Sequence, residues 1–184
     1  FNADSPILWW SPDPRMVLIP EQVKVSKSLK KTLKKQHYTV TVNKNFSAVI
    51  SACSKPRIEQ DGSIGWIHPD MIDAYTKLHK LGHAHSIECW EKDRLIGGLY
   101  GIAIGQIFFG ESMFSIATDS SKVALVTLCQ QLQKWEVKLI DCQIHSDHLA
   151  SMGAVEIDRS IFIDTLNQFC PINPVENSWK KIDK

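Results

Sequence analysis

The sequence lacks the features that mark membrane proteins and disulfide-rich proteins. No apolar run approaches the length of a membrane span, and no leader combines positive charge with a following apolar stretch. The five cysteines are scattered and never form a Cys-x-x-Cys pair, which favours reduced thiols in a cytoplasmic protein. The net charge is only +1, so overall charge indicates no class of partner. There is also no internal repeat and no low-complexity segment.

What is present has the composition of an ordinary globular domain. The 184 residues are 43% hydrophobic and 22% charged, which suits one domain or one domain with an appended piece. Because the chain begins at Phe1 and not at Met, we expect a fragment or a processed product. Residues 1–20 hold four of the eight prolines and the pair Trp9–Trp10. This density of proline predicts extended chain instead of helix.

Hydrophobic periodicity predicts alternating helices and strands over the rest of the chain. Helices are expected over 24–38, 43–54, 68–83, 118–135 and 159–170, and strands over 38–43, 85–90, 94–104, 106–114 and 137–144. Asn43 or Asn45 is expected to cap the second helix, and an Asp/Ser cap the fourth. The three strands between 85 and 114 are joined by tight turns and predict an antiparallel meander. The fold class is therefore α+β, or α/β with a mixed sheet.

The first predicted helix carries its lysines on one side. Val25, Leu29 and Leu33 form a narrow apolar stripe at four-residue spacing. Around that stripe stand six lysines: Lys24, Lys27, Lys30, Lys31, Lys34 and Lys35. Such a surface is either a solvated helix face or a footprint for a phosphate backbone, and we weigh the two interpretations equally.

Two short segments resemble zinc-binding sequences. They place together His79, His83 and His85, and further on Cys142, His145 and His148. Gly82, however, is expected to end the helix between the first two histidines, and neither Cys-x-x-Cys nor His-Glu-x-x-His occurs. We therefore favour capping or core histidines and predict no metal site.

The segment "LIDCQIHSDHL" starts as a strand but carries polar side chains. Strand alternation puts Asp141 and Gln143 on one face, about 6.6–7 Å apart, and turns Cys142 toward Ile140 and Ile144 as inert packing. Burying a carboxylate and an amide without partners costs several kcal/mol, so we expect a satisfied polar network. That network either holds the next loop in place or lines a reaction pocket.

An acidic residue occupies a strand of high apolar density. Glu111 stands between Phe108–Phe109 and Met113–Phe114. We expect its carboxylate to be paired or to meet a cationic ligand such as an amine. Trp9, Trp10 and Trp66 are either core residues or stacking platforms for a base.

Several long motifs, taken in order, match one family. "PILWWSPDPRMVL", "LHKLGHAHSIE", "GGLYGIAIG", "FFGESMFS", "SSKVALV" and "LIDCQ…HLASMGA" closely resemble the bacterial leucyl/phenylalanyl-tRNA–protein transferases from about Pro6 to Phe169. The resemblance implies a GNAT-like acyltransferase domain, here over residues 21–184. Residues 1–20 are then expected to be the remnant of a small N-terminal domain and its linker.

The resemblance also implies an activity. Members move leucine or phenylalanine, and methionine less well, from aminoacyl-tRNA to the N-terminal Arg or Lys of acceptor proteins, which marks them for N-degron proteolysis. The charged tRNA is itself the donor, so no cofactor is expected. We expect a cytoplasmic monomer without membrane contact. The alternatives are a related aminoacyl-tRNA-dependent acyltransferase with another acceptor, and a non-catalytic tRNA-binding module.

Roles transfer from the family to matching positions in this chain. Gln143 resembles the residue that orients the acceptor amine, and it acts there either as a base or only by positioning. Asp141 resembles the residue that polarises Gln143. Glu111 and the Gly110 backbone match the site for the aminoacyl ammonium, and Trp66 matches a tryptophan set against the terminal adenosine. Ser146 stands where some members have an Asn that contacts the aminoacyl group. The candidate walls of the aminoacyl pocket are Leu99, Met113, Leu128 and Ile140. Strict alternation along the strand points Ile140 away from Asp141. The cluster that matches the tRNA-backbone site consists of Lys27, Lys31, Lys34 and Lys35.

Overall fold

The computed structural model describes residues 10–55, 67–180 and 182, and a seven-stranded mixed sheet forms its centre. All neighbouring strands are antiparallel except β5 and β6, which run parallel. In sheet order the strands are β2 (Thr39–Val42), β3 (Ala84–Glu91), β4 (Arg94–Ile104), β5 (Ile107–Ser115), β6 (Leu139–Gln143), β1 (Arg15–Leu18) and β7 (Val155–Ile157). The mixed sheet of the predicted α+β class and the β3–β4–β5 meander are confirmed.

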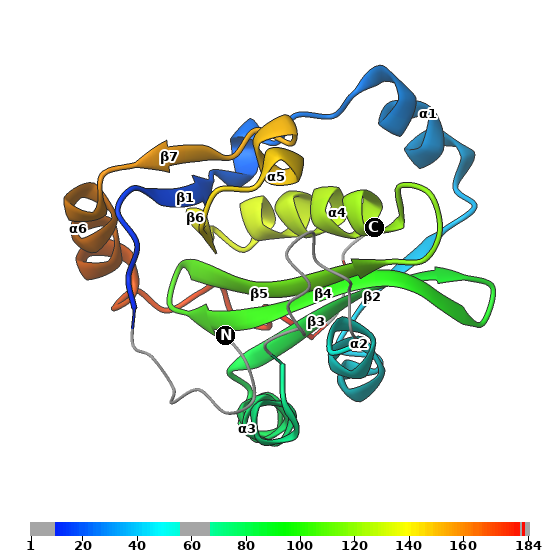
Figure 1. Ribbon diagram of the computed structural model, residues 1–184, viewed down its shortest axis with the longest axis horizontal. Helices are drawn as coiled ribbons and strands as arrows, with labels where there is room; N and C mark the ends of the chain where they lie inside the picture. Colours follow the sequence, from blue (N-terminus) through cyan, green and yellow to red (C-terminus); the bar gives the residue numbers. More distant parts are fainter. Residues whose placement is uncertain (1–9, 56–66, 181, 183–184) are drawn as a thin grey trace.

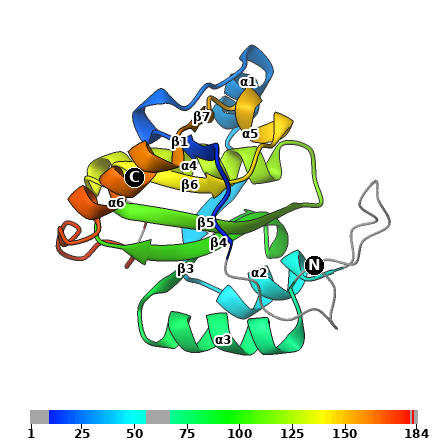
Figure 2. The same ribbon diagram turned by 60° about the vertical axis from the view of Figure 1, so that its left-hand side comes forward.

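Helices cover both faces of this sheet (Figure 1). The long helix α4 (Ser120–Lys134) packs across one face, and we call this the α4 face. Helices α2 (Phe46–Cys53) and α3 (Pro69–Lys80) pack on the other face. Helix α6 (Arg159–Phe169) lies on that same side, because Ile102 of the α2–α3 cluster is paired in register with Phe109 of the α6 cluster. Figure 2 shows α4 separated from α3 by the sheet.

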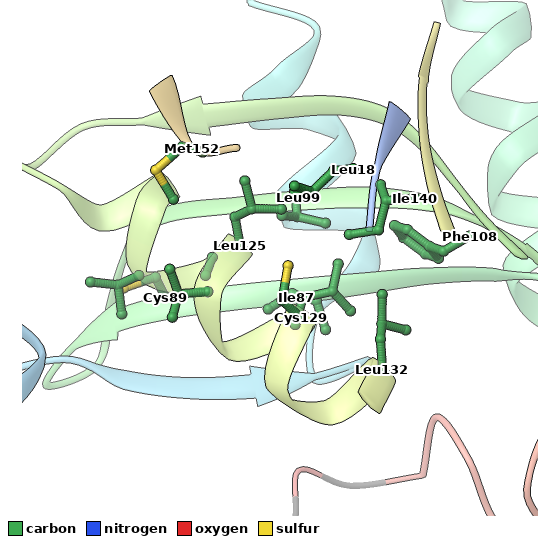
Figure 3. Packing of buried hydrophobic residues seen from close by; sticks show 14 of the residues in the cluster. Leu18, Ile87, Cys89, Leu99, Phe108, Leu125, Cys129, Leu132, Ile140 and Met152 are labelled. Atoms are coloured by element: carbon green, nitrogen blue, oxygen red, sulfur yellow. The ribbon is translucent and has the colours of Figure 1, made fainter. Parts of the chain in front are cut away.

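The main hydrophobic core fills the space between α4 and the sheet (Figure 3). Leu99 of β4, Ile140 of β6 and Leu128 of α4 belong to it and are all almost fully buried. Since residues on a strand alternate between faces, their neighbours Tyr100 and Leu139 enter the clusters on the opposite side. Strands β4 and β6 therefore carry apolar residues on both faces, as expected for a sheet that is covered twice.

Helix α1 (Lys27–Lys35) matches the predicted amphipathic helix in character. The Ser26 side chain caps its first turn by accepting from the Leu29 backbone N–H at 3.1 Å. Leu29 is buried, and Leu33 packs against the main core at the edge of α4. The helix ends at Gln36, whose φ of 50° lies in the left-handed region.

Three features differ from the sequence-based expectation. Residues 15–18, for which the sequence predicts only extended chain, form β1, an inner strand of the sheet between β6 and β7. The short elements β7 and α5 (Asp147–Ser151) were not predicted. The cap of α2 is Asn45, one of the two residues expected there, so that prediction is confirmed. Asp119 precedes α4 without a side-chain cap bond, because its carboxylate instead contacts Lys122 and the Thr32 hydroxyl. Within the described residues, no helix is both long and apolar enough to span a membrane.

Candidate active site

The candidate site lies where β5 and β6 part from each other. The two strands pair in register from Ile107↔Leu139 to Phe109↔Asp141. Beyond that point β5 continues to Ser115 along β4, while β6 ends at Gln143. Gly110 and Glu111 on one strand and Asp141 and Gln143 on the other therefore flank the point of divergence. The sheet brings together residues about thirty positions apart in the sequence.

Asp141 and Gln143 form one hydrogen-bonded unit. The Asp141 carboxylate accepts from the Gln143 backbone N–H at 3.0 Å and from its side-chain Nε2 at 3.2 Å. Gln143 Nε2 also donates to the Asp141 carbonyl oxygen at 3.2 Å. The expected polar network is present, but the two side chains touch and are not held apart as they would be in a regular strand.

A local break in the strand explains this contact. Gln143 has a φ of 61°, in the left-handed region that a residue with a side chain rarely adopts. An Asp side chain that accepts from the N–H two residues on is a common way to turn a chain. A register shift between Met16 and Val17 of the neighbouring strand β1 accommodates the irregularity. Strained residues and bulges of this kind cluster at functional sites.

Asp141 is fully buried and paired with an arginine that sequence reasoning missed. Arg15 of β1 donates from Nε to Oδ1 at 2.9 Å and from Nη2 to Oδ2 at 2.7 Å, which makes a bidentate pair. Only the motif "SPDPR" in the resemblance pointed at this residue, and no spacing argument links positions 126 residues apart.

Cys142 takes no part in this polar unit. It packs against the main core on the α4 face together with Ile140. Burial raises the pKa of its thiol to about 12, so the reactive thiolate is not formed near neutral pH. The prediction that Cys142 is inert packing is confirmed.

Glu111 lies on the opposite side of the divergence and is also half-buried. It accepts a hydrogen bond from the Tyr75 hydroxyl of α3 at 2.7 Å. Burial raises the pKa of Glu111, and the nearby Asp141 charge adds to this, while the Tyr75 hydrogen bond and the Arg15 charge oppose it. Within the part of the chain that the structure describes, Glu111 is thus paired with a neutral donor and not with a cation, and its carboxylate is able to bind a positively charged ligand.

Gly110 is a glycine that the fold itself does not require. A Cβ added there would meet the Asp141 carbonyl oxygen at 3.4 Å and Ile140 Cγ2 at 3.7 Å, both ordinary contacts. At Gly98, in contrast, a Cβ would lie 2.6 Å from a backbone oxygen of β3. Glycine without a steric need within the fold is typical of a place that a ligand approaches closely.

The predicted apolar walls lie on the other face of the sheet. Leu99, Leu128 and Ile140 are packed in the main core on the α4 face, and half-buried Met113 packs against them. Asp141 and Glu111 contact Arg15 and Tyr75 on the α3–α6 side. The prediction that Ile140 points away from Asp141 is correct. The predicted residues therefore form an apolar group and a polar group, with Gly110 between them.

The remaining candidates are spread more widely. Ser146 is the N-cap of α5 and accepts from the Leu149 backbone N–H at 3.5 Å. The four lysines assigned to tRNA are exposed on α1, whereas Trp66 lies outside the described residues. The histidines serve separate local contacts: His79 stacks on Phe46, His85 on Trp179, and His145 contacts Asp147. Among the described residues, no three His, Cys, Asp or Glu side chains gather as a metal site would need.

The chain has close relatives among curated sequences. A family model described as leucyl/phenylalanyl-tRNA protein transferase matches residues 17–167. A protein of that name from Nitrosomonas europaea is 55% identical over 179 residues, covering 97% of this chain and 75% of the relative. One from Shewanella woodyi is 52% identical, covering 98% of this chain and 76% of the relative. One from Saccharophagus degradans is 48% identical, covering 100% and 77%.

Solved structures of similar shape share little sequence with the chain. A GCN5-related N-acetyltransferase from Kribbella flavida aligns with a TM-score of 0.49 at 11% identity, over 79% of this chain and 55% of that one. The structure of L-PGS from Bacillus licheniformis aligns with a TM-score of 0.46 at 11% identity, over 77% and 51%. Similarity at this level carries no argument about chemistry.

Proposed function

This chain belongs to the leucyl/phenylalanyl-tRNA protein transferase family, and we propose that it transfers leucine or phenylalanine, and methionine less well, from aminoacyl-tRNA to the N-terminal Arg or Lys of acceptor proteins. The new N-terminal residue would mark the acceptor for proteolysis. The observation that carries this proposal for the site is the Asp141–Gln143 unit facing Glu111 where β5 and β6 part. In that arrangement the Gln143 amide oxygen can accept from the N–H of the acceptor amine, and the Glu111 carboxylate can bind the ammonium of the aminoacyl group.

The reaction joins an amine to an activated acyl group. The acceptor α-amine attacks the ester carbonyl, the resulting tetrahedral intermediate expels the ribose oxygen of the terminal adenosine, and the proton lost from the amine ends on that leaving oxygen. Because an ester is already activated, positioning and amine deprotonation are sufficient and no covalent enzyme intermediate is needed. We assign to Gln143 the orientation of the amine and to Asp141 the orientation of Gln143.

The aminoacyl group is proposed to be held at both ends. Its ammonium would bind the Glu111 carboxylate and the Gly110 carbonyl oxygen, since both flank the divergence of β5 and β6. Its side chain would enter the apolar group of Leu99, Met113, Leu128 and Ile140, with Ser146 near the pocket. Side chains unbranched at Cβ would fit there, with discrimination against Val and Ile limited to about 1–3 kcal/mol.

The lysines of α1 are proposed to bind the tRNA backbone. Lys27, Lys31, Lys34 and Lys35 are all exposed, and among the described residues none of them forms an ion pair. Trp66 keeps its proposed place against the terminal adenosine. A donor of this kind is found in the cytoplasm, and the five free cysteines suit a reducing compartment, so we propose a cytoplasmic monomer that needs no cofactor.

The direct test is transfer of labelled leucine from Leu-tRNA to short peptides. We expect label on a peptide that begins with Arg or Lys, and none on matched peptides that begin with Ala or Gly. Label on all four would point to an acyltransferase with a broader acceptor. Binding of tRNA without labelling of any peptide would contradict catalysis by this chain.

Glu111 should make binding of the aminoacyl group depend on pH. Burial raises the pKa of Glu111 above the ordinary 4.5. As the pH falls, the Glu111 carboxylate is therefore protonated, and loses its charge, at a higher pH than an ordinary glutamate. The preference for aminoacyl-tRNA over uncharged tRNA should therefore be full above that raised pKa and disappear as the pH falls through it. The measurement is the ratio of the two Kd values against pH.

Two variants give this pH dependence its controls. Glu111→Gln should remove both the preference and its pH dependence. Tyr75→Phe removes a hydrogen bond that lowers the pKa of Glu111, so the loss should move to higher pH. A preference that is unchanged in Glu111→Gln would show that the ammonium binds elsewhere.

A further inference from the structure

Arg15 encloses one side of the Asp141 carboxylate. Its Nε and Nη2 atoms donate one hydrogen bond to each carboxylate oxygen, at 2.9 and 2.7 Å. The Arg15 side chain is 11% exposed and that of Asp141 is 0% exposed, so water reaches this pair poorly. Arg15 also lies outside the sequence interval of all the other candidate residues. Its strand β1 is placed beside β6 by the sheet.

The Asp141 carboxylate has no free acceptor position left. Oδ1 accepts from Arg15 Nε and from the Gln143 backbone N–H, and Oδ2 accepts from Arg15 Nη2 and from Gln143 Nε2. A carboxylate offers about four acceptor positions. With all of them used, Asp141 cannot take the proton of an attacking amine, and it acts as an anchor.

This arrangement also determines which end of the Gln143 amide faces the substrate. The two groups next to Gln143 Nε2 are the Asp141 carbonyl oxygen and Asp141 Oδ2, and both can only accept. The NH2 group therefore faces Asp141. The amide oxygen Oε1 is turned away from Asp141, and a neutral amide oxygen is a good acceptor for an amine N–H but a poor base.

Arg15 is itself held in place from behind. Its Cζ atom lies 4.9 Å from the centroid of the Phe162 ring on α6, and Phe162 is buried. The ring face attracts the guanidinium and restricts it to one plane. The chain of contacts thus runs from Phe162 through Arg15 and Asp141 to Gln143.

We propose that Arg15 is a positioning residue for aminoacyl transfer, which acts by locking the Asp141 carboxylate so that Gln143 presents its amide oxygen to the acceptor amine. The proposal rests on the function proposed above. Lysine cannot replace Arg15, because an ammonium lacks the planar fork that contacts both oxygens at once. Misplacement of a reacting group by about 1 Å is enough to lower a rate by about 10²-fold.

The activity test compares Arg15→Lys in two backgrounds. In the otherwise unchanged protein, kcat should fall about tenfold or more, with the KM for aminoacyl-tRNA changed less than about twofold. In the Gln143→Ala background, the same substitution should have no further effect on kcat, because the residue it positions is gone. Arg94→Lys on the exposed β3–β4 hairpin is the matched control and should leave kcat unchanged. An equal fold-loss from Arg15→Lys in both backgrounds would overturn the proposal.

A second measurement does not depend on activity. The side-chain NH2 signal of Gln143, identified by its absence in Gln143→Ala, should show low mobility in the ¹⁵N relaxation of the unchanged protein and high mobility in Arg15→Lys. Phe162→Leu, which keeps an apolar side chain but removes the ring, should increase that mobility less. If the Gln143 signal is equally rigid in all three folded proteins, Arg15 does not position it. If the Gln143 signal becomes mobile in Arg15→Lys but the unchanged protein labels no peptide, the result would contradict the proposed function and leave the positioning of Gln143 by Arg15 supported.

Discussion

Gln143→Ala should lower kcat for aminoacyl transfer by about 10²-fold or more and leave the Kd for aminoacyl-tRNA nearly unchanged. The side chain is half-buried and touches only Asp141 among the contacts described for it, so its removal leaves no buried charge unpaired. What is lost is the amide oxygen that orients the acceptor amine. The measurements are single-turnover labelling of an Arg-initiated peptide and tRNA binding at equilibrium.

Asp141→Ala should lower kcat at least as much but also destabilise the protein. Removing the carboxylate leaves the Arg15 guanidinium buried and uncompensated, which costs about 3–5 kcal/mol of unfolding free energy. Urea unfolding of each variant separates this loss of stability from the loss of rate. At urea concentrations well below the unfolding midpoint, the kcat of folded Asp141→Ala can then be compared with that of Gln143→Ala.

Cys142→Ala is the matched control for both variants. Cys142 stands between the two residues in sequence but packs toward the core on the α4 face. Its replacement should leave kcat within about twofold and cost roughly 1 kcal/mol of stability. Equal loss of transfer and tRNA binding in Asp141→Ala and Gln143→Ala would argue against any role in the chemical step.

Reversing two charges on α1 should weaken the binding of every tRNA. Lys31 and Lys34 are exposed on the face of the helix that points away from the core. If each contacts a phosphate, the double variant Lys31→Glu/Lys34→Glu should lose affinity by about tenfold or more near 0.15 M salt. The slope of log K against log salt concentration should become shallower by about 1.4–1.8, since each lost phosphate contact removes about 0.7–0.9.

The control for this variant is a pair of lysines that are also exposed but lie at a distant place. Lys77 and Lys80 are exposed on α3, which lies on the far side of the sheet from α1 (Figures 1 and 2). Lys77→Glu/Lys80→Glu changes the net charge by the same amount, so it reports the effect of overall charge alone. An unchanged salt slope in the α1 variant, or an equal change in both, would show that the α1 lysines are only a solvated surface.

Local patterns were sufficient for the elements whose apolar residues repeat clearly. The four-residue spacing of Val25, Leu29 and Leu33 predicted α1, and the runs of β-branched residues around tight turns predicted the β3–β4–β5 meander. Alternation placed Cys142 and Ile140 in the core and Asp141 on the opposite face. These predictions hold because the period of an element decides which side chains share a face.

Elements that are stabilised by distant partners were missed. Strand β1 is four residues long and follows a proline-rich segment, so nothing local distinguishes it from extended chain. It becomes a strand because β6 and β7, more than a hundred residues away in sequence, pair with both its edges. The same holds for β7, which has only three residues.

The sequence by itself determined the periodic elements, the mixed fold class, the exposed lysine face of α1 and the family to which the chain belongs. Only the tertiary structure decided that Gln143 turns at the end of β6 to bond Asp141, that Arg15 binds the Asp141 carboxylate from the neighbouring strand, and that Glu111 pairs with Tyr75 of α3. The physical reason is that hydrophobic period is a local property, whereas the partners of a buried polar group must come from wherever the sheet brings a donor within about 3 Å.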